Sequence, residues 1–373
     1  MRRTILSVIG TRPEAIKMAP VVQQLQRHPD DFTSLVCSTG QHREMLDQAL
    51  QLFAITPDFD LHLMTHNQGL AQLTARLFSA LDETLARVKP DCVLAQGDTT
   101  TVLVTSLTAF YRGIPFGHVE AGLRTGDKRR PFPEEINRRL ADVVSDLYFA
   151  PTARAREALL REGVAPGAIS VTGNTVIDAL LEVASRPYTW RGSPLAELPE
   201  DGQYVLITAH RRESFGEAFR QLCLAIRELA DEFAPQGLQF VYPVHLNPNV
   251  RAPVGEILGP ARNVTLLEPL DYVSLAQVMK RSTLILTDSG GIQEEAPSLG
   301  VPALVMRETT ERPEGIEAGV VKLVGANRER IVTEARRLLT DPAAHAAMAT
   351  PANPYGDGHA AERIVAALKE YLA

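Results

Sequence analysis

Short apolar runs rich in β-branched residues alternate with longer helical patterns along almost the whole chain. This alternation is typical of βαβ units around parallel sheets, so the sequence predicts an α/β fold throughout. The predicted strands form two series of similar rhythm, which predicts two Rossmann-like domains. The first series comprises residues 4–10, 34–39, 92–97, 114–120, 147–151 and 169–173, and the second comprises residues 203–209, 238–244, 263–268, 283–288, 302–306 and 320–324.

The segment between the two series, residues 185–202, is rich in proline, glycine and polar residues. This composition makes it the best candidate for an interdomain linker. The chain ends in turn residues followed by apolar residues at Ile364, Ala367, Leu368 and Tyr371. Their spacing predicts an amphipathic C-terminal helix.

Composition narrows the classes of partner. The chain has 373 residues, 45% of them hydrophobic, and a formal charge of −7, so neither nucleic acid nor a membrane surface is expected as a partner. Its cysteines, Cys37, Cys92 and Cys223, form no Cys-x-x-Cys pair, which argues against a zinc site or a disulfide framework and fits a reducing cytoplasm. No apolar run reaches the ~18 residues of a membrane span, and the first run is too short for a signal peptide.

Ligands of open α/β sheets bind at the carboxyl ends of the strands, so these ends are the candidate sites. The first is GTRPEAIKMAP, in which Pro13 suits the first helical position. A free helix N-terminus flanked by Arg12 and Lys17 is a candidate anion site, although an ordinary turn with exposed charges fits equally well. The apolar stripe predicted for this helix comprises Ala15, Met18, Ala19, Val22 and Leu25.

The second strand end is LTDSGGIQEEAPSLGVP, in which Ser289, Gly290 and Gly291 precede a helix. Glycines allow a phosphate to approach backbone amides, and Glu294 or Glu295 is placed to accept ribose hydroxyls. A structural N-cap followed by surface glutamates is the alternative. No Gly-x-Gly-x-x-Gly fingerprint exists in the chain, so a bound nicotinamide dinucleotide is unsupported. We expect no cofactor.

Two further strand ends carry candidate residues. ITAHRRESFG places His210 and Arg211 where a diphosphate would need positive charge, and YPVHLNP places His245 similarly. AQGDTTT places Asp98 at the end of a very apolar strand, where an N-cap role is slightly favoured over a catalytic one. In RETTERPE, Arg312 follows another strand and fits either a site or a solvated loop.

The stretch HVEAGLRTGDKRRPFPEEINRR mixes four carboxylates with six basic residues. Ile136, Leu140 and Val143 are predicted to form the buried face of its helix, so Glu134 and Arg138 point away from that core. At this spacing the two residues form either a surface ion pair or one wall of a site that also includes the strand-end Glu120.

Taken together and in order, these motifs resemble the bacterial non-hydrolysing UDP-N-acetylglucosamine 2-epimerases from residue 4 to the final helix. The resemblance implies a GT-B-like fold of two Rossmann-like domains facing a cleft, and a homodimer. It implies an N-terminal domain of residues 1–173, a C-terminal UDP-binding domain of residues 174–355, and a final helix within residues 356–373 that packs back on the first domain. The motifs are GTRPEAIKMAP, TGQHREML, QGDTTT, HVEAGLRTGD, PFPEEINR, VTGNTVID, TAHRRESFG, YPVHLNP, DSGGIQEEAPSLG, RETTERPE and NPYGDGHAAERI.

The family's reaction inverts C2 of UDP-N-acetylglucosamine to give UDP-N-acetylmannosamine for cell-surface polysaccharides. Elimination of UDP would give 2-acetamidoglucal, and UDP would then add back to it. This route needs no nicotinamide cofactor. The resemblance implies acid/base roles for Asp98, Glu120 and Glu134, with His210 near the diphosphate. The implied substrate-binding residues are Arg12, Lys17, Arg138, Ser289, Gly290, Gly291, Glu295 on the ribose, and Arg312. Tyr272 is a candidate to stack on the uracil, and a core aromatic is the alternative.

Some family members are activated by their own substrate at a second site. Gln41, Arg211 and His245 match that pattern, but Glu44 and Asn67 depart from it, so we expect weak or absent activation. Three alternatives stay open: a hydrolysing epimerase, a GT-B glycosyltransferase that uses a UDP-sugar, and a nucleotide-sugar sensor without activity.

Overall fold

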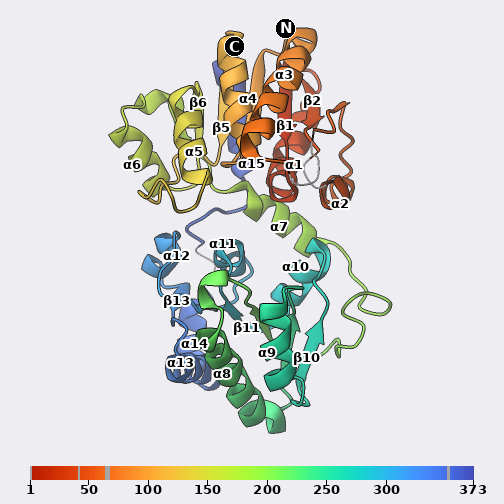
Figure 1. Cartoon of the computed structure of the whole chain (residues 1–373), viewed down its shortest axis with the longest axis vertical. Coiled ribbons are helices and arrows are strands. Elements are labelled where there is room, and N and C mark those ends of the chain that lie inside the picture. The colour runs from red at the N-terminus through yellow and green to blue at the C-terminus, as the bar shows by residue number, and fades with distance from the viewer. Residues whose placement is uncertain (1, 41–42, 64–67, 351–352) are drawn as a thin grey trace. The chain divides into compact units, whose positions relative to one another are not determined.

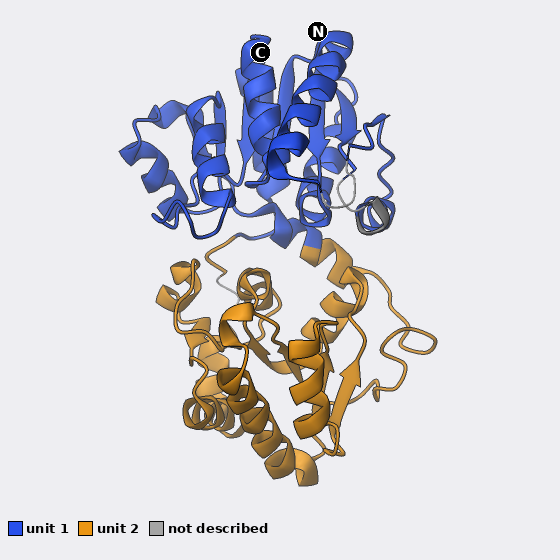
Figure 2. Cartoon of the chain, viewed as in Figure 1, with its two compact units in different colours: residues 1–179, 356–373 blue, residues 180–355 orange. Residues whose placement is uncertain are grey.

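The computed structural model describes residues 2–40, 43–63, 68–350 and 353–373, and it has the predicted alternation of strands and helices (Figure 1). The chain forms two compact units (Figure 2). Unit 1 comprises Met1–Ala179 and Gly356–Ala373, and unit 2 comprises Leu180–Tyr355. The chain therefore passes from the first unit to the second before it reaches the proposed linker.

Unit 1 is built around a parallel sheet with the strand order β3-β2-β1-β4-β5-β6-β7. Its strands are β1 (Arg3–Ile9), β2 (Phe32–Ser38), β3 (Phe59–Asp60), β4 (Cys92–Gln96), β5 (Phe116–Val119), β6 (Leu147–Ala150) and β7 (Ile169–Val171). Its helices are α1 (Arg12–Gln26), α2 (Arg43–Leu52), α3 (Leu70–Val88), α4 (Thr100–Tyr111), α5 (Glu134–Val143), α6 (Ala153–Arg161), α15 (Ala360–Tyr371) and α7 (Thr175–Ser185), which contains the unit boundary.

Unit 2 is built around a second parallel sheet with the strand order β10-β9-β8-β11-β12-β13. Its strands are β8 (Tyr204–Thr208), β9 (Gln239–Pro243), β10 (Val264–Leu267), β11 (Ser282–Thr287), β12 (Ala303–Val305) and β13 (Val321–Leu323). Its helices are α8 (Glu217–Phe233), α9 (Pro248–Leu258), α10 (Tyr272–Lys280), α11 (Gly290–Ser298), α12 (Pro313–Glu317), α13 (Arg328–Thr340) and α14 (Pro342–Met348).

Every strand of the two predicted series is present, and β3, which has only two residues, is the one addition among the described residues. The central strands have continuous apolar runs because helices cover both faces of a parallel sheet. All five residues of β4 are buried, for example. The sequence-based fold class is therefore confirmed at the level of two parallel-sheet α/β units.

Each sheet has one topological switch point, where the strand order reverses. In unit 1 it lies between β1 and β4, and in unit 2 it lies between β8 and β11. Ligands of such sheets bind outside the carboxyl ends of the strands at this point. Candidate residues follow all four of these strands, among them Arg12, Asp98, His210 and Ser289.

The prediction that residues 185–202 form a linker is wrong. Trp190, Leu195 and Leu198 are buried within unit 2, and the indole of Trp190 stacks on the Tyr204 ring at a centroid distance of 5.6 Å. Proline and glycine indicated an irregular segment correctly, but three apolar side chains anchor that segment to the second core.

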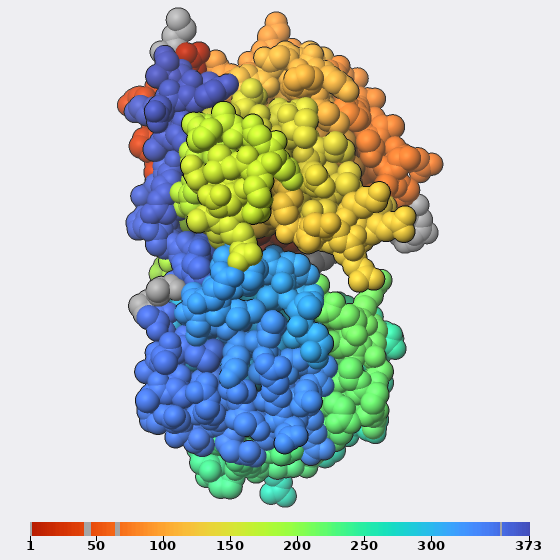
Figure 3. All heavy atoms as spheres, turned by 90° about the vertical axis from the view of Figure 1, so that its left-hand side faces the viewer, coloured from red at the N-terminus to blue at the C-terminus, as the bar shows by residue number. Residues whose placement is uncertain are grey.

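The C-terminal helix α15 belongs to unit 1, where it packs against α1 and lies next to β7. Figure 3 shows it in dark blue beside the yellow-green segment that contains β7. Ile364 and Leu368 are fully buried, whereas Tyr371 is 45% exposed although it was predicted on the same face. The carboxylate of Asp178 accepts hydrogen bonds from the first two N–H groups of the helix, at 3.2 and 2.8 Å.

Candidate active site

The start of α1 is closed by its own side chains. Thr11 is the N-cap, and Glu14 Oε2 accepts hydrogen bonds from the N–H groups of Gly10 at 2.5 Å and Thr11 at 3.1 Å. The prediction of a free helix N-terminus is therefore wrong, because a carboxylate of the chain already occupies it. The predicted stripe is confirmed, since Ala15, Met18, Ala19, Val22 and Leu25 are all fully buried.

Glu14 itself was missed, although Thr-x-x-Glu at a helix start is the sequence signature of a capping box. Its side chain is buried, and burial raises the pKa of Glu14 to about 7. Hydrogen bonds from Thr99, Gly10 and Thr11 lower this pKa, and the charge of Asp98 raises it. Glu14, with a pKa of about 7, is therefore close enough to the strand-end residue Asp98 to feel its charge.

Glu120 is held by donors from three separate parts of the chain. Lys17 Nζ lies 2.8 Å from both carboxylate oxygens, Asn174 Nδ2 lies 3.2 Å from Oε1, and the amide of Gln96 also donates to Oε2. The residue is buried and has a φ of 69°, in the left-handed region that costs a non-glycine residue energy. Such strain concentrates at functional sites, where the surrounding contacts maintain it.

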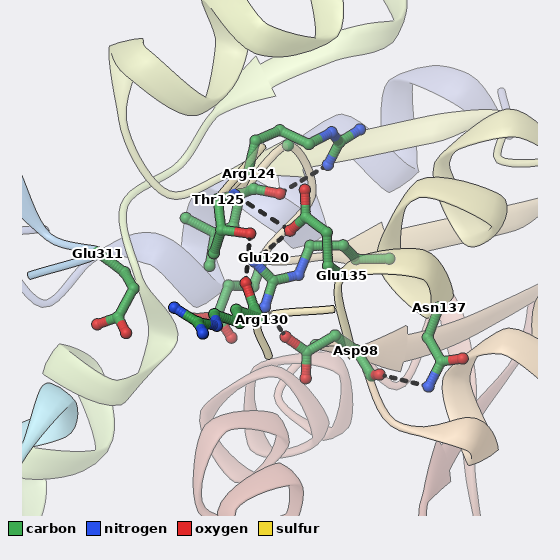
Figure 4. Close-up of polar contacts among 12 residues, drawn as sticks. Asp98, Glu120, Arg124, Thr125, Arg130, Glu135, Asn137 and Glu311 are labelled. Atoms are coloured by element: carbon green, nitrogen blue, oxygen red, sulfur yellow. Dashed lines mark hydrogen bonds and ion pairs between the residues drawn. The ribbon is translucent and has the colours of Figure 1, made fainter. Parts of the chain in front are cut away.

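Asp98 is not an N-cap. The cap of α4 is Thr99, whose hydroxyl accepts a hydrogen bond from the N–H of Val102. The Asp98 carboxylate instead pairs with the guanidinium of Arg138, and the Asn137 amide donates to the Asp98 carbonyl at 2.9 Å (Figure 4). The structure therefore brings Asp98, which follows β4, together with Arg138 of α5.

The predicted buried face of α5 is wrong. Ile136, Leu140 and Val143 are 36%, 45% and 76% exposed, whereas Glu135 is fully buried. The carboxylate of Glu135 accepts from the N–H groups of Thr125 at 3.1 Å and Gly126 at 3.2 Å (Figure 4). Partners from a preceding loop outweigh the apolar periodicity of the helix itself.

Because the opposite face of α5 is buried, the side chains of Glu134 and Arg138 are partly buried rather than fully exposed to solvent. The Arg138 side chain is only 11% exposed, and its Nη1 atom lies 3.4 Å from Oε2 of Glu135. Glu134 Oε2 and Arg138 Nε are buried and make no hydrogen bond within the described part of the chain. Buried polar atoms without a hydrogen bond are uncommon and require an explanation, such as a catalytic role or a bound water or ion.

A buried ion pair supports the loop that carries Asp98. His118 Nδ1 lies 2.6 Å from Asp142, and Nε2 lies 2.7 Å from the carbonyl oxygen of Gly97, which can only accept. Burial lowers the pKa of His118, but Asp142 outweighs this effect and raises it. Burial raises the pKa of Asp142, but His118 and Arg124 lower it overall. The imidazolium of His118 therefore anchors Gly97, the residue before Asp98. Sequence patterns did not reveal this contact.

In unit 2, Asp288 connects the two strands of the switch point. Its Oδ2 accepts hydrogen bonds from the N–H groups of His210 at 2.6 Å and Arg211 at 2.7 Å. The His210 ring is 44% exposed and stacks on the His245 ring at a centroid distance of 5.2 Å. The three predicted residues His210, Arg211 and His245 therefore lie together, and Asp288 is the neighbour that sequence reasoning missed.

The start of α11 is organised differently from the start of α1. Ser289 is at the N-cap position, but its side chain makes no capping hydrogen bond. Arg312 packs over Gly290, so that a Cβ there would lie 2.7 Å from Nη1, and Glu294 pairs with the same guanidinium. Gly291 has no such neighbour, since the closest atom to its Cβ position is Glu295 Oε2 at 4.0 Å.

Tyr272 and Glu295 are direct partners, since the buried tyrosine hydroxyl donates to Glu295 Oε1 at 2.8 Å. Arg12 is half-buried at the first position of α1. Gln41 and Asn67 lie outside the described residues, as does the side chain of Glu44.

Within the described ranges, no group of three or more His, Cys, Asp or Glu side chains is arranged to hold a metal ion. Over the same ranges, no helix combines the length and apolar character needed to cross a membrane.

Proteins of known family and structure resemble this chain over almost its whole length. The family model of UDP-N-acetylglucosamine 2-epimerases matches residues 23–369. The UDP-N-acetylglucosamine 2-epimerases of Salmonella typhimurium and Escherichia coli are each 54% identical, and each alignment covers 98% of both chains. A Neisseria meningitidis UDP-GlcNAc 2-epimerase structure with bound UDP-GlcNAc is 48% identical, with a TM-score of 0.87 over 98% of this chain and 100% of that one.

A glycosyltransferase structure that is 13% identical has a TM-score of 0.62 and shares the fold alone. The GT-B-like class predicted from the sequence is thereby confirmed. The chain belongs to the UDP-N-acetylglucosamine 2-epimerase family.

Proposed function

We propose that this protein interconverts UDP-N-acetylglucosamine and UDP-N-acetylmannosamine by inverting C2, without releasing free sugar. Family membership supports the substrate. The observation that carries the proposal is the pairing at the unit 1 switch point, where Lys17 contacts Glu120 and Arg138 contacts Asp98. Proton transfer at C2 needs such positioned carboxylates, whereas simple binding of a nucleotide sugar does not.

The chemical difficulty is that the C2 proton is not next to a carbonyl group. Elimination avoids it: the C1–O bond breaks and its electron pair leaves with UDP, while a base removes the C2 proton. The electrons of the C2–H bond form the C1=C2 double bond of 2-acetamidoglucal. UDP then adds back to C1 and a proton is delivered to the opposite face of C2. No net oxidation occurs, so no redox cofactor is needed.

In this proposal Asp98, Glu120 and Glu134 exchange protons with the two faces of C2. The buried and unsatisfied Glu134 Oε2 supports a direct contact with the sugar. Arg12, Lys17 and Arg138 would balance the charge of these carboxylates and of the substrate. These side chains follow β1, β4 and β5 or belong to α5.

The unit 2 switch point would hold the UDP moiety. His210, Ser289, Gly290 and Gly291 present donors for a diphosphate at a helix start. Arg312, fixed by Glu294, adds positive charge. Glu295 would bind the ribose, and its hydrogen bond to Tyr272 supports placing the ribose and the uracil side by side.

Incubation with UDP-N-acetylglucosamine in D2O, followed by NMR of the products, tests the proposal. We expect UDP-N-acetylmannosamine with deuterium at C2 and no accumulation of free sugar. Free N-acetylmannosamine with released UDP would instead establish a hydrolysing epimerase. UDP release that depends on an acceptor would establish a glycosyltransferase, and the absence of turnover would favour a sensor.

We infer weak or absent activation by substrate, since Glu44 and Asn67 depart from the pattern of activated members. The rate should therefore be hyperbolic in UDP-N-acetylglucosamine. A sigmoidal dependence in the forward direction, abolished in the reverse assay by traces of UDP-N-acetylglucosamine, would contradict this expectation.

We also propose that two copies of unit 1 associate through α4 and α5, which pack against each other. Their exposed side chains include Phe110, Tyr111, Leu140 and Val143, which are 45% to 76% exposed. Apolar patches of this kind mark interaction surfaces. Light scattering should give twice the 40.8 kDa chain mass, and Val143→Asp should give the monomer. A monomeric wild-type protein would exclude the homodimer.

The cytoplasmic location stays a prediction from sequence.

A further inference from the structure

Asp288 is a buried carboxylate whose two oxygens have unequal surroundings. Oδ2 accepts hydrogen bonds from two consecutive backbone N–H groups, those of His210 and Arg211. Oδ1 is also buried but makes no hydrogen bond within the described residues. His210 Nδ1 lies 3.8 Å from it. An unsatisfied buried carboxylate oxygen costs free energy and requires an explanation.

The position of this residue in the sheet makes the arrangement rigid. Asp288 follows β11, and its own N–H donates to the carbonyl oxygen of Thr208 at the end of β8 at 2.9 Å. The carboxylate thus spans the switch point of unit 2, where the proposed diphosphate site lies. The His210 ring is less constrained, since it is 44% exposed. A hydrogen bond between them requires Nδ1 to come closer to Oδ1 than the present 3.8 Å.

We propose that Asp288 is a positioning residue for His210, accepting a hydrogen bond from Nδ1–H and thereby directing Nε2 toward the diphosphate. This inference rests on the proposed function of the site. A carboxylate behind an imidazole selects the tautomer and stabilises the imidazolium that forms when the ring meets negative charge. When UDP departs from C1, an imidazolium at Nε2 would donate to the leaving phosphate oxygen.

The charges around the pair favour the neutral imidazole until an anion arrives. Burial lowers the pKa of His210, Asp288 opposes this effect, and His245 and Arg211 lower the pKa further. Burial raises the pKa of Asp288, although the N–H groups of Arg211 and His210 act against it. The His245 ring stacks on the His210 ring at a centroid distance of 5.2 Å, so a positive charge on both rings is unfavourable. Tyr242 is a further titratable neighbour of Asp288. A bound diphosphate adds negative charge, which favours the imidazolium.

The substitution Asp288→Asn tests the proposal because it preserves shape and reverses one hydrogen bond. The amide oxygen can still accept from the two backbone N–H groups, but the NH2 group then faces Nδ1 as a donor. We expect kcat for epimerisation to fall roughly 100-fold, with a change in KM below about threefold. We also expect the pH profile of kcat to lose the ionisation of His210.

The tautomer of His210 gives a readout that does not depend on turnover. In 15N NMR spectra of UDP-saturated protein, assigned by comparison with His210→Gln, wild-type His210 should carry its proton on Nδ1 or on both nitrogens. In Asp288→Asn the same ring should carry it on Nε2. Identical protonation in the two proteins would overturn the proposal. Because this experiment uses UDP alone, it is interpretable even if the wild-type protein fails to epimerise, an outcome that would reject only the proposed function.

A double-substitution cycle separates positioning from stability. In the His210→Gln background, Asp288→Asn should cause no further loss of kcat, whereas multiplicative losses would overturn the proposal. Asp341→Asn is the matched control, since Asp341 also accepts from two consecutive N–H groups, those of Ala343 at 2.9 Å and Ala344 at 3.1 Å. Asparagine caps helices about as well as aspartate, so we expect this control to match the wild type in kcat.

Discussion

The two switch points use carboxylates in opposite ways. In unit 1, Asp98 and Glu120 present their carboxylates to cationic side chains, Arg138 and Lys17. In unit 2, the carboxylate of Asp288 turns inward to backbone N–H groups, and the loops present histidine, serine and glycine instead. In the function proposed above, the carboxylates of unit 1 transfer protons, whereas the loops of unit 2 hold the diphosphate.

The largest effect should come from removing a carboxylate of unit 1. Glu120→Gln and Glu134→Gln each lose an acid/base group, so we expect kcat to fall roughly 1,000-fold or more. UDP affinity, measured by calorimetry, should stay within about twofold because UDP is assigned to unit 2.

Glu157→Gln serves as the control for both variants, since this glutamate of α6 is 59% exposed and remote from the proposed chemistry. Unchanged turnover in both Glu120→Gln and Glu134→Gln would reject the acid/base assignment. A parallel loss of UDP affinity would show that the two ends are not functionally distinct.

Glu14 should make the stability of the protein depend on pH. Its pKa is raised from 4.5 to about 7, so the folded state binds more protons than the unfolded state between these values. The free energy of unfolding therefore falls as pH rises through this window, by on the order of 3 kcal/mol in total. Glu14→Gln keeps an acceptor for the Gly10 and Thr11 N–H groups but lacks this titration.

Urea unfolding of the wild type and Glu14→Gln at pH 5 and pH 8 measures the effect. The variant should gain stability relative to the wild type as the pH rises. A difference between the two proteins that is the same at both pH values would mean that Glu14 titrates at its ordinary value.

The smallest of these effects concerns the glycines of α11. In Gly290→Ala the new Cβ would displace the Arg312 guanidinium, since it would lie 2.7 Å from Nη1. We expect UDP affinity to fall about tenfold, or about 1.4 kcal/mol. Gly291→Ala is the matched comparison, because the closest atom to its Cβ position is 4.0 Å away, and it should change affinity by less than about threefold. Equal losses would show that backbone approach, rather than Arg312, limits binding.

The strands and the stripe of α1 could be predicted because they depend on local pattern and on burial of both sheet faces. The α5 face could not, because Glu135 and Asp142 are buried by partners from elsewhere in the chain. The apolar residues of that helix are exposed instead, and periodicity alone cannot distinguish a core from a docking surface.

Candidate residues at the strand ends could be found because strand ends and switch points are general binding positions. Their supporting residues could not. Asp288 and the Arg211 N–H that it accepts from are 77 positions apart and meet only through the pairing of β8 with β11. Trp190 lies in a segment whose composition is that of a linker, and only the core it enters reveals its role.

The position of α15 has a consequence for synthesis. The ion pair between Lys369 and Asp31 joins residues 338 positions apart, and Ile364 and Leu368 are fully buried in unit 1. Unit 1 therefore cannot complete its core until the last helix has left the ribosome, whereas unit 2 is contiguous from Leu180 to Tyr355. Since domains generally fold as units during translation, we expect the second unit to mature first and the docking of α15 to be the final step.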